Sequence, residues 1–317
     1  MSDALLIFYL RPARRKARSV AIAEALSLLQ DLHAVAPGGG PLSEQGGLFW
    51  VALPADAVQS AIDRMPGLGY TYAVDLLEPA QEKQSPSEHR KHISQRRGVH
   101  WQGKPYHLIR VYEEDAEAMR ARAPDRRVFL LETHEHEVRA VQGYRGDGQA
   151  FSRRGLPVYD ARLLVNLVFA GEGTHFLDPF AGIGGIVIEA LASGCIVVSS
   201  DRDPALRHGL AHLGAQHHVA DARRLPFAAE MFDAIATEPP YNEQAMPMLI
   251  EALHEMYRVL KTGGRLALLC AASQAEELRR EAGGLGLKSY LDSAIDRKGL
   301  EVVVLAWEKE KRGSTEE

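Results

Sequence analysis

The chain has 317 residues, a formal net charge of −5 and 46% hydrophobic residues. This length is typical of two domains, and the composition is that of a globular protein with a core of normal size. No run of 18 apolar residues is present, which excludes an ordinary membrane-spanning helix, and the early basic residues follow the first apolar run, the wrong order for a secretory signal. Cys195 and Cys270 lie in apolar runs, so we expect buried free thiols, no metal site and a cytoplasmic location.

The charge is unevenly distributed along the chain. Residues 1–157 carry 21 Lys and Arg against 19 Asp and Glu, whereas residues 158–317 carry 16 against 23. Basic residues cluster at 11–18 and at 90–104, and such clusters contact the phosphates of nucleic acids. A solvated protein surface would show the same clusters. The basic side chains that we expect to bind a nucleic-acid substrate are Arg14, Arg15, Arg96, Arg97 and Arg153.

The first part of the chain alternates short strands with helices. Apolar runs predict strands at 5–10, 48–53 and 70–77, and apolar residues at helical spacing predict helices at 19–33 and 55–65. The order βαβαβ indicates a small ferredoxin-like α+β domain over residues 1–80.

The middle of the chain, residues 81–144, is predicted to be a linker or a reduced RNA-binding region. Residues 79–105 are polar and contain three prolines, which is typical of an exposed loop. Two short strand-like runs follow at 128–132 and 137–143.

The third part, residues 145–317, alternates strands and helices from residue 158 onward. Helices are predicted at 158–170, 184–193, 204–213, 243–260 and 273–283. Strands are predicted at 174–178, 195–200, 216–219, 232–237, 264–270, 289–294 and 300–307. Such alternation predicts an α/β fold, a parallel sheet with helices on both faces.

A glycine-rich turn follows the first of these strands. The segment contains Asp178, Pro179 and Phe180 and then Gly182 and Gly184. Glycines let the backbone approach a ligand at the carboxyl end of the sheet. A valine stands where the dinucleotide-binding fingerprint requires its third glycine. The carboxylate is poorly suited to a pyrophosphate and well suited to an ammonium or sulfonium group, so the turn favours S-adenosylmethionine over NAD as the cofactor.

Two further acids end the next two strands. Asp201 is where a carboxylate can bind ribose hydroxyls. Asp221 could accept a hydrogen bond from the adenine amino group, and the backbone N–H of Ala222 could serve the adenine ring. One glycine-rich turn alone would also fit a simple strand–helix connection, but three acids at successive strand ends favour the cofactor site.

The strand at 232–237 leads into Glu238-Pro239-Pro240-Tyr241 and then Asn242. An exocyclic amino group is a poor nucleophile because its lone pair is delocalised into the ring. The Glu238 side chain can accept one N–H and the Pro239 carbonyl the other, while the prolines stiffen the turn and the tyrosine ring stacks on a base. A merely rigid loop would also contain paired prolines. We predict that this tetrapeptide is catalytic, without a metal, and that Asn242 contacts the substrate.

The order Asp-Pro-Phe-x-Gly-x-Gly, acid, Asp-Ala and x-Pro-Pro-Tyr resembles the Rossmann-like S-adenosylmethionine-dependent amino-methyltransferases. More narrowly, it resembles the tRNA guanosine-N2 methyltransferases, which have an N-terminal ferredoxin-like and RNA-binding region. The segment Arg162–Val168 is similar to that family's helix entering the cofactor pocket. The resemblance covers residues 145–270, and the N-terminal third only in architecture. It implies a tRNA partner and base-binding or catalytic roles for Glu238, Pro239 and Tyr241. It implies cofactor roles for Asp178, Gly182, Gly184, Asp201 and Asp221.

The chain departs from the family pattern at two positions. Glu238 stands where the family has Asp or Asn, and Asn242 stands where it has Gly. The N-terminal part is also short for a full THUMP module. Three alternatives therefore stay open: an adenine-N6 or cytosine-N4 methyltransferase acting on RNA or DNA, a protein glutamine-N5 methyltransferase, and a non-catalytic RNA-binding module that retains the cofactor fold.

Overall fold

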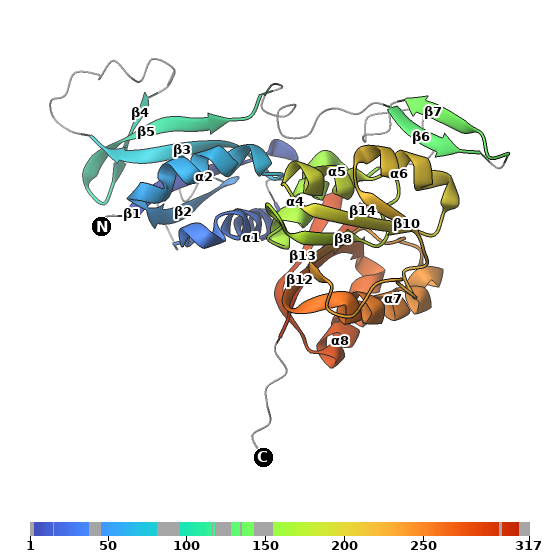
Figure 1. The fold of residues 1–317 in the computed structure, drawn as a ribbon. Helices are drawn as coiled ribbons and strands as arrows, with labels where there is room; N and C mark the ends of the chain where they lie inside the picture. The colour runs from blue at the N-terminus through green and yellow to red at the C-terminus, as the bar shows by residue number, and fades with distance from the viewer. Residues whose placement is uncertain are drawn as a thin grey trace. The chain divides into compact units, whose positions relative to one another are not determined.

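The computed structural model describes residues 3–14, 16–37, 46–80, 96–115, 117, 128–133, 135–142, 155–297 and 300–310. The chain forms two compact units, Met1–Ala121 and Arg122–Glu317 (Figure 1). The three-part division predicted from the sequence, with boundaries at residues 80 and 144, stays a prediction about the domains.

The N-terminal unit is the smaller α+β domain that the sequence predicts. Its strands are β1 (Asp3–Leu10), β2 (Leu48–Pro54), β3 (Thr71–Pro79), β4 (Arg96–Trp101) and β5 (Lys104–Glu113). Its helices are α1 (Arg18–Leu28) and α2 (Val58–Arg64), with 3₁₀ turns at Pro12–Arg14, Gln30–Leu32, Ala55–Ala57 and Met65–Gly67. The strands form one antiparallel sheet in the order β2-β1-β3-β5-β4. The prediction of an exposed loop over residues 79–105 is wrong for residues 96–101, which form β4, and for residues 104–105, which begin β5.

The N-terminal sheet is buried on both faces near its centre. Phe8 stacks on Phe49 with ring centroids 4.9 Å apart, while the neighbouring Ile7 points the opposite way and packs in a second cluster with Trp50 and Val99. Because successive side chains of a strand point to opposite faces, burial on both faces explains why β1 reads as an unbroken apolar run.

The C-terminal unit contains the α/β sheet. Its strands are β6 (Val128–Glu132), β7 (Val138–Gln142), β8 (His175–Asp178), β9 (Ile196–Asp201), β10 (Gln216–Val219), β11 (Phe232–Thr237), β12 (Leu260–Ala271), β13 (Leu287–Arg297) and β14 (Leu300–Lys309). Its helices are α4 (Val158–Leu167), α5 (Gly185–Ala192), α6 (Arg207–Leu213), α7 (Met246–Val259) and α8 (Ala272–Leu285), with 3₁₀ turns at Pro204–Leu206 and Glu243–Ala245. Every helix and strand predicted in this part is confirmed, with shifts of a few residues at the ends.

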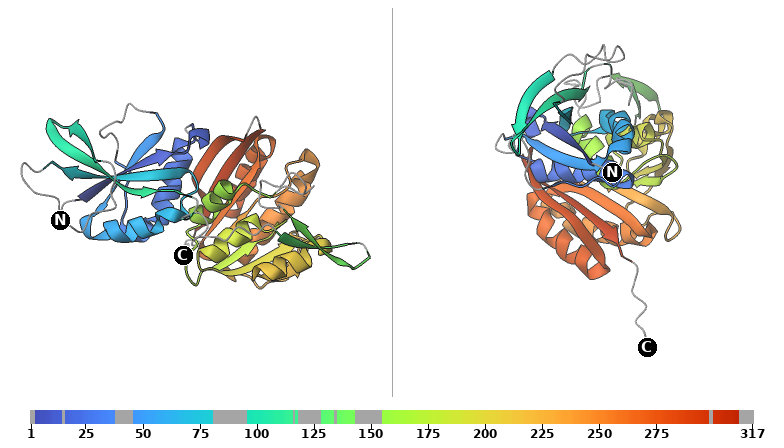
Figure 2. Two further views of the ribbon diagram at one scale, coloured as in Figure 1. Left: turned by 90° about the horizontal axis from the view of Figure 1, so that it is seen from above. Right: turned by 90° about the vertical axis from the view of Figure 1, so that its left-hand side faces the viewer.

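The large sheet has the order β10-β9-β8-β11-β12-β14-β13. The strands from β10 to β12 are parallel, and β14 runs antiparallel to both of its neighbours. Helices α4, α5 and α6 cover one face, and α7 and α8 cover the other (Figure 2). The strand order reverses between β8 and β11, so a topological switch point lies at their carboxyl ends, where open α/β sheets bind ligands.

The small hairpin β6–β7 packs against α6. The Phe129 ring is buried and fills the space left by Gly209, where an added Cβ would lie 2.2 Å from the ring. Glu132 forms ion pairs with Arg207 (3.0 Å) and His208 (3.2 Å). Among the residues that the structure describes, no helix is both long and apolar enough to span a membrane.

Candidate active site

Acidic side chains gather at the carboxyl edge of the large sheet. Asp178 ends β8, Asp201 ends β9, and Glu238 directly follows β11. These three strands are parallel neighbours, so their ends meet at one edge. Both Asp201 and Glu238 lie close enough to Asp178 to influence its charge. The structure therefore brings these three predicted site residues together at the switch point.

The Asp178 carboxyl is almost completely buried, with 1% of the residue exposed. Its Oδ1 accepts hydrogen bonds from the Thr237 hydroxyl (2.8 Å) and the Phe180 backbone N–H (3.2 Å). Burial raises the pKa of Asp178 to about 7, and the negative charges of Asp201 and Glu238 act in the same direction. No cationic side chain in the described part of the chain pairs with it. A buried carboxyl among acids suits a positively charged ligand.

The turn after Asp178 is shaped by its glycines and by Asp201. The Asp201 carboxylate accepts hydrogen bonds from the backbone N–H of Gly182 and of Asp203, each at 2.9 Å. Gly184 has φ +81°, and an added Cβ would lie 2.4 Å from a methyl group of Leu213. The positive φ and this close contact require glycine at position 184, where α5 begins. Pro179 is buried in the same turn.

Asp221 and Ala222 follow β10, as the sequence predicts. The Asp221 side chain is partly exposed and accepts hydrogen bonds from Arg223 Nη2 (2.7 Å) and Nε (3.1 Å). Arg223 holds the pKa of the Asp221 carboxyl below its usual value. The sequence does not predict the ion pair between Asp221 and Arg223, although a single residue separates them. Ala222 is buried.

The tetrapeptide is held by a hydrogen-bond network that the sequence did not reveal. Glu238 Oε1 accepts a hydrogen bond from the Tyr241 hydroxyl and another from Arg297 Nη1 at 2.7 Å. The same Arg297 nitrogen donates to the Tyr241 hydroxyl oxygen at 2.8 Å. Within the described residues no group donates to Glu238 Oε2, so this oxygen is left as an acceptor.

Arg297 lies at the end of β13, and its guanidinium also pairs with a second carboxylate. Its Nε lies 3.2 Å from Oδ2 of Asp160, a buried carboxylate in the first turn of α4. Because β14 runs antiparallel to both β12 and β13, β13 is parallel to β11 and ends at the same edge of the sheet. Arg297 and Glu238 are 59 positions apart, and nothing in the local sequence of either residue points to the other.

Gln274, in the first turn of α8, fixes the other end of the tetrapeptide. Its buried side-chain amide donates to the backbone carbonyls of Pro240 (2.9 Å) and Asn242 (3.2 Å) and accepts from the N–H of Ala271 (3.1 Å). The Pro239 carbonyl has no partner among the described residues. The Asn242 side chain is exposed. Nothing in the sequence distinguishes Gln274 from other helix residues, so the sequence does not predict its contact with the loop.

The predicted nucleic-acid contacts belong largely to the N-terminal unit. The Arg14 guanidinium lies over the Tyr70 ring at 5.2 Å, and Arg97 is exposed on β4. Arg15, Arg153 and the side chain of Arg96 lie outside the described residues. The role of these side chains in substrate binding stays a prediction.

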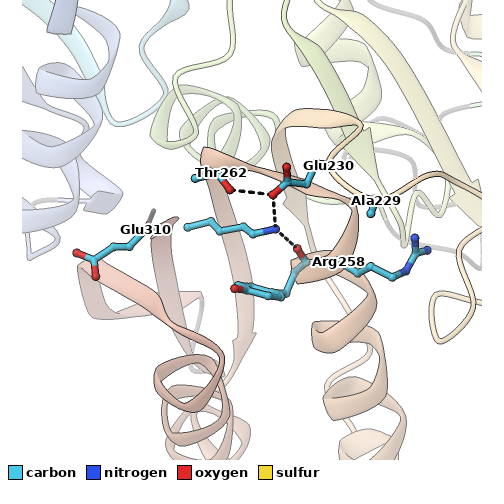
Figure 3. A pocket seen from close by; sticks show the side chains of 7 residues that line it. Ala229, Glu230, Arg258, Thr262 and Glu310 are labelled. Atoms are coloured by element: carbon cyan, nitrogen blue, oxygen red, sulfur yellow. Dashed lines mark hydrogen bonds and ion pairs between the residues drawn. The ribbon is translucent and has the colours of Figure 1, made fainter. Parts of the chain in front are cut away.

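A separate cavity of about 610 Å³ lies at the opposite, amino edge of the large sheet (Figure 3). Its lining includes Lys309, whose ammonium group donates to the carbonyls of Tyr257 (2.9 Å) and Leu260 (2.7 Å) and pairs with Glu230 at 3.3 Å. All three ammonium hydrogens have acceptors, so this lysine stabilises the strand ends and offers no free cation to a ligand. No group of His, Cys, Asp and Glu able to hold a metal ion is present in the described ranges.

Comparison with known proteins identifies the C-terminal unit. Residues 177–268 match the family model of a methyltransferase domain. The match runs from β8 into β12 and so includes the glycine-rich turn, the acids at the strand ends and the tetrapeptide. Residues 177–268 are thus similar to a methyltransferase domain, and they lie in a sheet with a Rossmann-like order of strands.

Individual relatives match part of the chain. The tRNA (guanine(10)-N2)-dimethyltransferase of Pyrococcus abyssi is 36% identical over 140 residues, which are 39% of this chain and 41% of the relative. A demethylmenaquinone methyltransferase of Mycobacterium sp. (strain KMS) is 35% identical over 131 residues, 40% of this chain and 53% of the relative. The solved structure of TrmN from Thermus thermophilus aligns over 96% of this chain and 99% of its own, with 18% identity and a TM-score of 0.49. The chain thus spans about half or less of these curated relatives, which leaves its substrate to be inferred from the site.

Proposed function

We propose that this protein methylates an exocyclic amino group of a nucleobase and that its target is guanine N2 in tRNA. The observation that carries the proposal is the pairing of Glu238 with Arg297 in a Pro-Pro-Tyr loop at the switch point. The relatives alone do not select a substrate, because a demethylmenaquinone methyltransferase matches about as well as a tRNA enzyme. The chemistry of the loop therefore selects the class of substrate.

The residues at the carboxyl edge fit the cofactor. Asp178 supplies a buried carboxylate for its ammonium or sulfonium charge, and the absence of a side chain at Gly182 keeps the turn open to it. We assign Asp201 to the ribose hydroxyls, since each of its oxygens retains a lone pair beyond the one used by the turn. We assign Asp221 and Ala222 to the binding of the adenine. Bound there, S-adenosylmethionine supplies an electrophilic methyl group.

The tetrapeptide makes the target amine nucleophilic. Glu238 Oε2 and the Pro239 carbonyl, both without partners in the described part of the chain, accept its two hydrogens. Two acceptors favour a pyramidal nitrogen whose lone pair is free to attack. The Tyr241 ring stacks on the base, which contributes about 1–3 kcal/mol. Attack leaves a positively charged nitrogen, and we assign Glu238 to accept the proton that this nitrogen then loses.

The acceptor Oε2 of Glu238 favours guanine over the other amines. This oxygen can accept more than one hydrogen bond. In guanine, N1 beside the amino group carries a hydrogen and can donate, whereas N3 on the other side is an acceptor. In adenine and cytosine, the ring nitrogen beside the amino group is an acceptor, and in a glutamine amide the neighbour is a carbonyl oxygen. Guanine can therefore offer Oε2 a second donor, N1–H, which the other three amines lack.

Transfer of a labelled methyl group from S-adenosylmethionine to bulk tRNA, followed by nucleoside analysis, tests the proposal. Labelled N2-methylguanosine is the expected product. Labelled N6-methyladenosine or N4-methylcytosine would keep the mechanism and refute the argument from acceptors. No label in tRNA would refute the tRNA substrate, and DNA and protein glutamine would then be tried, with a non-catalytic RNA-binding role as the remaining alternative.

The basic N-terminal residues supply the expected contacts with the tRNA backbone. A variant with Arg14, Arg15, Arg96 and Arg97 changed to Ala should bind tRNA more weakly at low salt and show a smaller dependence of affinity on salt. Its affinity for S-adenosylmethionine should match that of the wild type. The control carries Arg279→Ala and Arg280→Ala on α8, which remove positive charge elsewhere. Equal tRNA affinity of the quadruple variant and the wild type would contradict this assignment.

A further inference from the structure

Three segments distant in sequence meet at Arg297. Asp160 comes from α4, Glu238 from the loop after β11, and Arg297 from the end of β13. Arg297 is 17% exposed and Asp160 1%. A buried carboxylate is costly unless it is paired, so Asp160 restricts where the guanidinium can lie. The guanidinium in turn presents one nitrogen, Nη1, to both Glu238 and Tyr241.

This arrangement depends on the length of the Glu238 side chain. An aspartate at position 238 would be one methylene shorter. Here the longer side chain reaches Arg297 and Tyr241 through Oε1 while Oε2 stays without a protein partner in the described residues. One oxygen thus fixes the side chain and the other is left for the substrate.

We propose that Arg297, held by Asp160, is a positioning residue that fixes the Glu238 side chain and aims Oε2 at the amino group to be methylated. The role of Oε2 rests on the proposed function, whereas the anchoring of the loop does not. Arg297 acts through Glu238 and Tyr241 and contacts no reacting atom.

The test uses Arg297→Met and Arg297→Lys in the full chain. Methionine removes the charge but keeps much of the volume, and lysine restores the charge without the forked geometry. The matched control is Arg279→Met. Arg279 also joins a helix to β13, through Asp292 (2.5 and 2.7 Å), but it does not contact the tetrapeptide.

The kinetics of methyl transfer to tRNA should distinguish a positioning role of Arg297 from a purely structural role. At saturating cofactor and tRNA, Arg297→Met should lower kcat by roughly 10- to 100-fold, in the range seen when a group that orients a catalytic residue is removed. The KM for tRNA and the affinity for S-adenosylmethionine should change by less than about threefold, because the interaction matters mainly in the transition state. Arg297→Lys should recover part of the loss in kcat.

A double-mutant cycle with Glu238→Gln tests whether Arg297 acts through Glu238. In that background the amide carries no charge to be stabilised, so Arg297→Met should add less than about threefold to the loss. Equal losses in the two backgrounds would overturn the inference, as would a wild-type kcat in Arg297→Met.

Amide hydrogen exchange of residues 237–245 provides a readout that needs no substrate. Exchange should be several-fold faster in Arg297→Met than in the wild type and unchanged in Arg279→Met. Wild-type protein that transfers no methyl group to tRNA would refute the proposed function, and the exchange rates would still decide whether Arg297 anchors the loop. Unchanged exchange in Arg297→Met would overturn the inference whatever the activity.

Discussion

The buried Asp178 carboxyl should make cofactor binding depend on pH. Burial raises its pKa to about 7, and the neighbouring Asp201 and Glu238 add to the effect. The protonated carboxyl cannot neutralise a sulfonium or ammonium group. Below pH 7, binding of S-adenosylmethionine must therefore displace a proton from Asp178, and the affinity should fall as the pH falls.

The size of the effect follows from the titration. At pH 6 about nine-tenths of the carboxyl is protonated, so the apparent affinity should fall about tenfold for each pH unit below 7, which is about 1.4 kcal/mol per unit. The α-amino group of the cofactor has a pKa of roughly 8, so the affinity should also decline above that pH. The tightest binding is expected between these two values.

Protonation of Asp178 does not by itself favour unfolding. The pKa of Asp178 is 3.8 for the free side chain and about 7 in the folded protein, so between these values the folded state binds a proton that the unfolded state lacks. The contribution of Asp178 to the free energy of unfolding is therefore larger at low pH and declines as the pH rises through this window. Protonation of this group weakens ligand binding while it favours the fold.

The effect can be measured by isothermal titration calorimetry with S-adenosylmethionine. Titrations at about pH 5.5, 6.5 and 7.5 cover the range in which Asp178 changes its protonation state. Two buffers of different ionisation enthalpy report the proton released on binding. The control is Asp178→Asn, which should bind weakly at every pH, without proton release at the acidic values. An affinity in the wild type that does not change between pH 5.5 and 7.5, or the same slope in Asp178→Asn, would refute the reasoning.

Four further substitutions test other parts of the structure. Glu238→Ala should reduce methyl transfer by at least roughly 10²-fold while circular dichroism and cofactor affinity stay as in the wild type; full activity would contradict the proposed mechanism. Gln274→Ala removes two hydrogen bonds to the loop and leaves a buried backbone N–H without its acceptor, so urea denaturation should show a loss of about 1–3 kcal/mol. Gly209→Ala should destabilise the protein by about 1–3 kcal/mol because the Phe129 ring must move, whereas Gly283→Ala, on the open surface of α8, should stabilise it by about 0.5–1 kcal/mol; the same sign for both would contradict the packing argument.

Local sequence patterns are sufficient for much of the C-terminal unit. Buried parallel strands read as short apolar runs, and the acids that end them stand out at Asp178 and Asp201. The Pro-Pro-Tyr loop is recognisable because its position after β11 is itself readable from the sequence. These signals lie within a few residues of one another, so no knowledge of tertiary contacts is needed to interpret them.

The N-terminal unit shows where such patterns fail. The polar composition of residues 79–105 predicts an exposed loop, yet residues 96–101 form β4 and residues 104–105 begin β5. Strand β4 pairs only with β5, at the edge of its sheet, and of its side chains Val99 is buried while Arg97 and His100 are exposed. An edge strand with so few buried residues reads as polar, because only its pairing partner makes it a strand.

The α/β class, the glycine-rich turn and the tetrapeptide can be predicted from residue order alone, since each depends on neighbouring residues. The surroundings of Glu238 follow from the tertiary structure. Arg297 reaches it because the antiparallel β14 returns β13 to the same edge of the sheet, and Asp160 pairs with Arg297 from the first turn of α4. The orientation of the glutamate side chain depends on where distant strands end, and that is fixed by strand order, which no local pattern encodes.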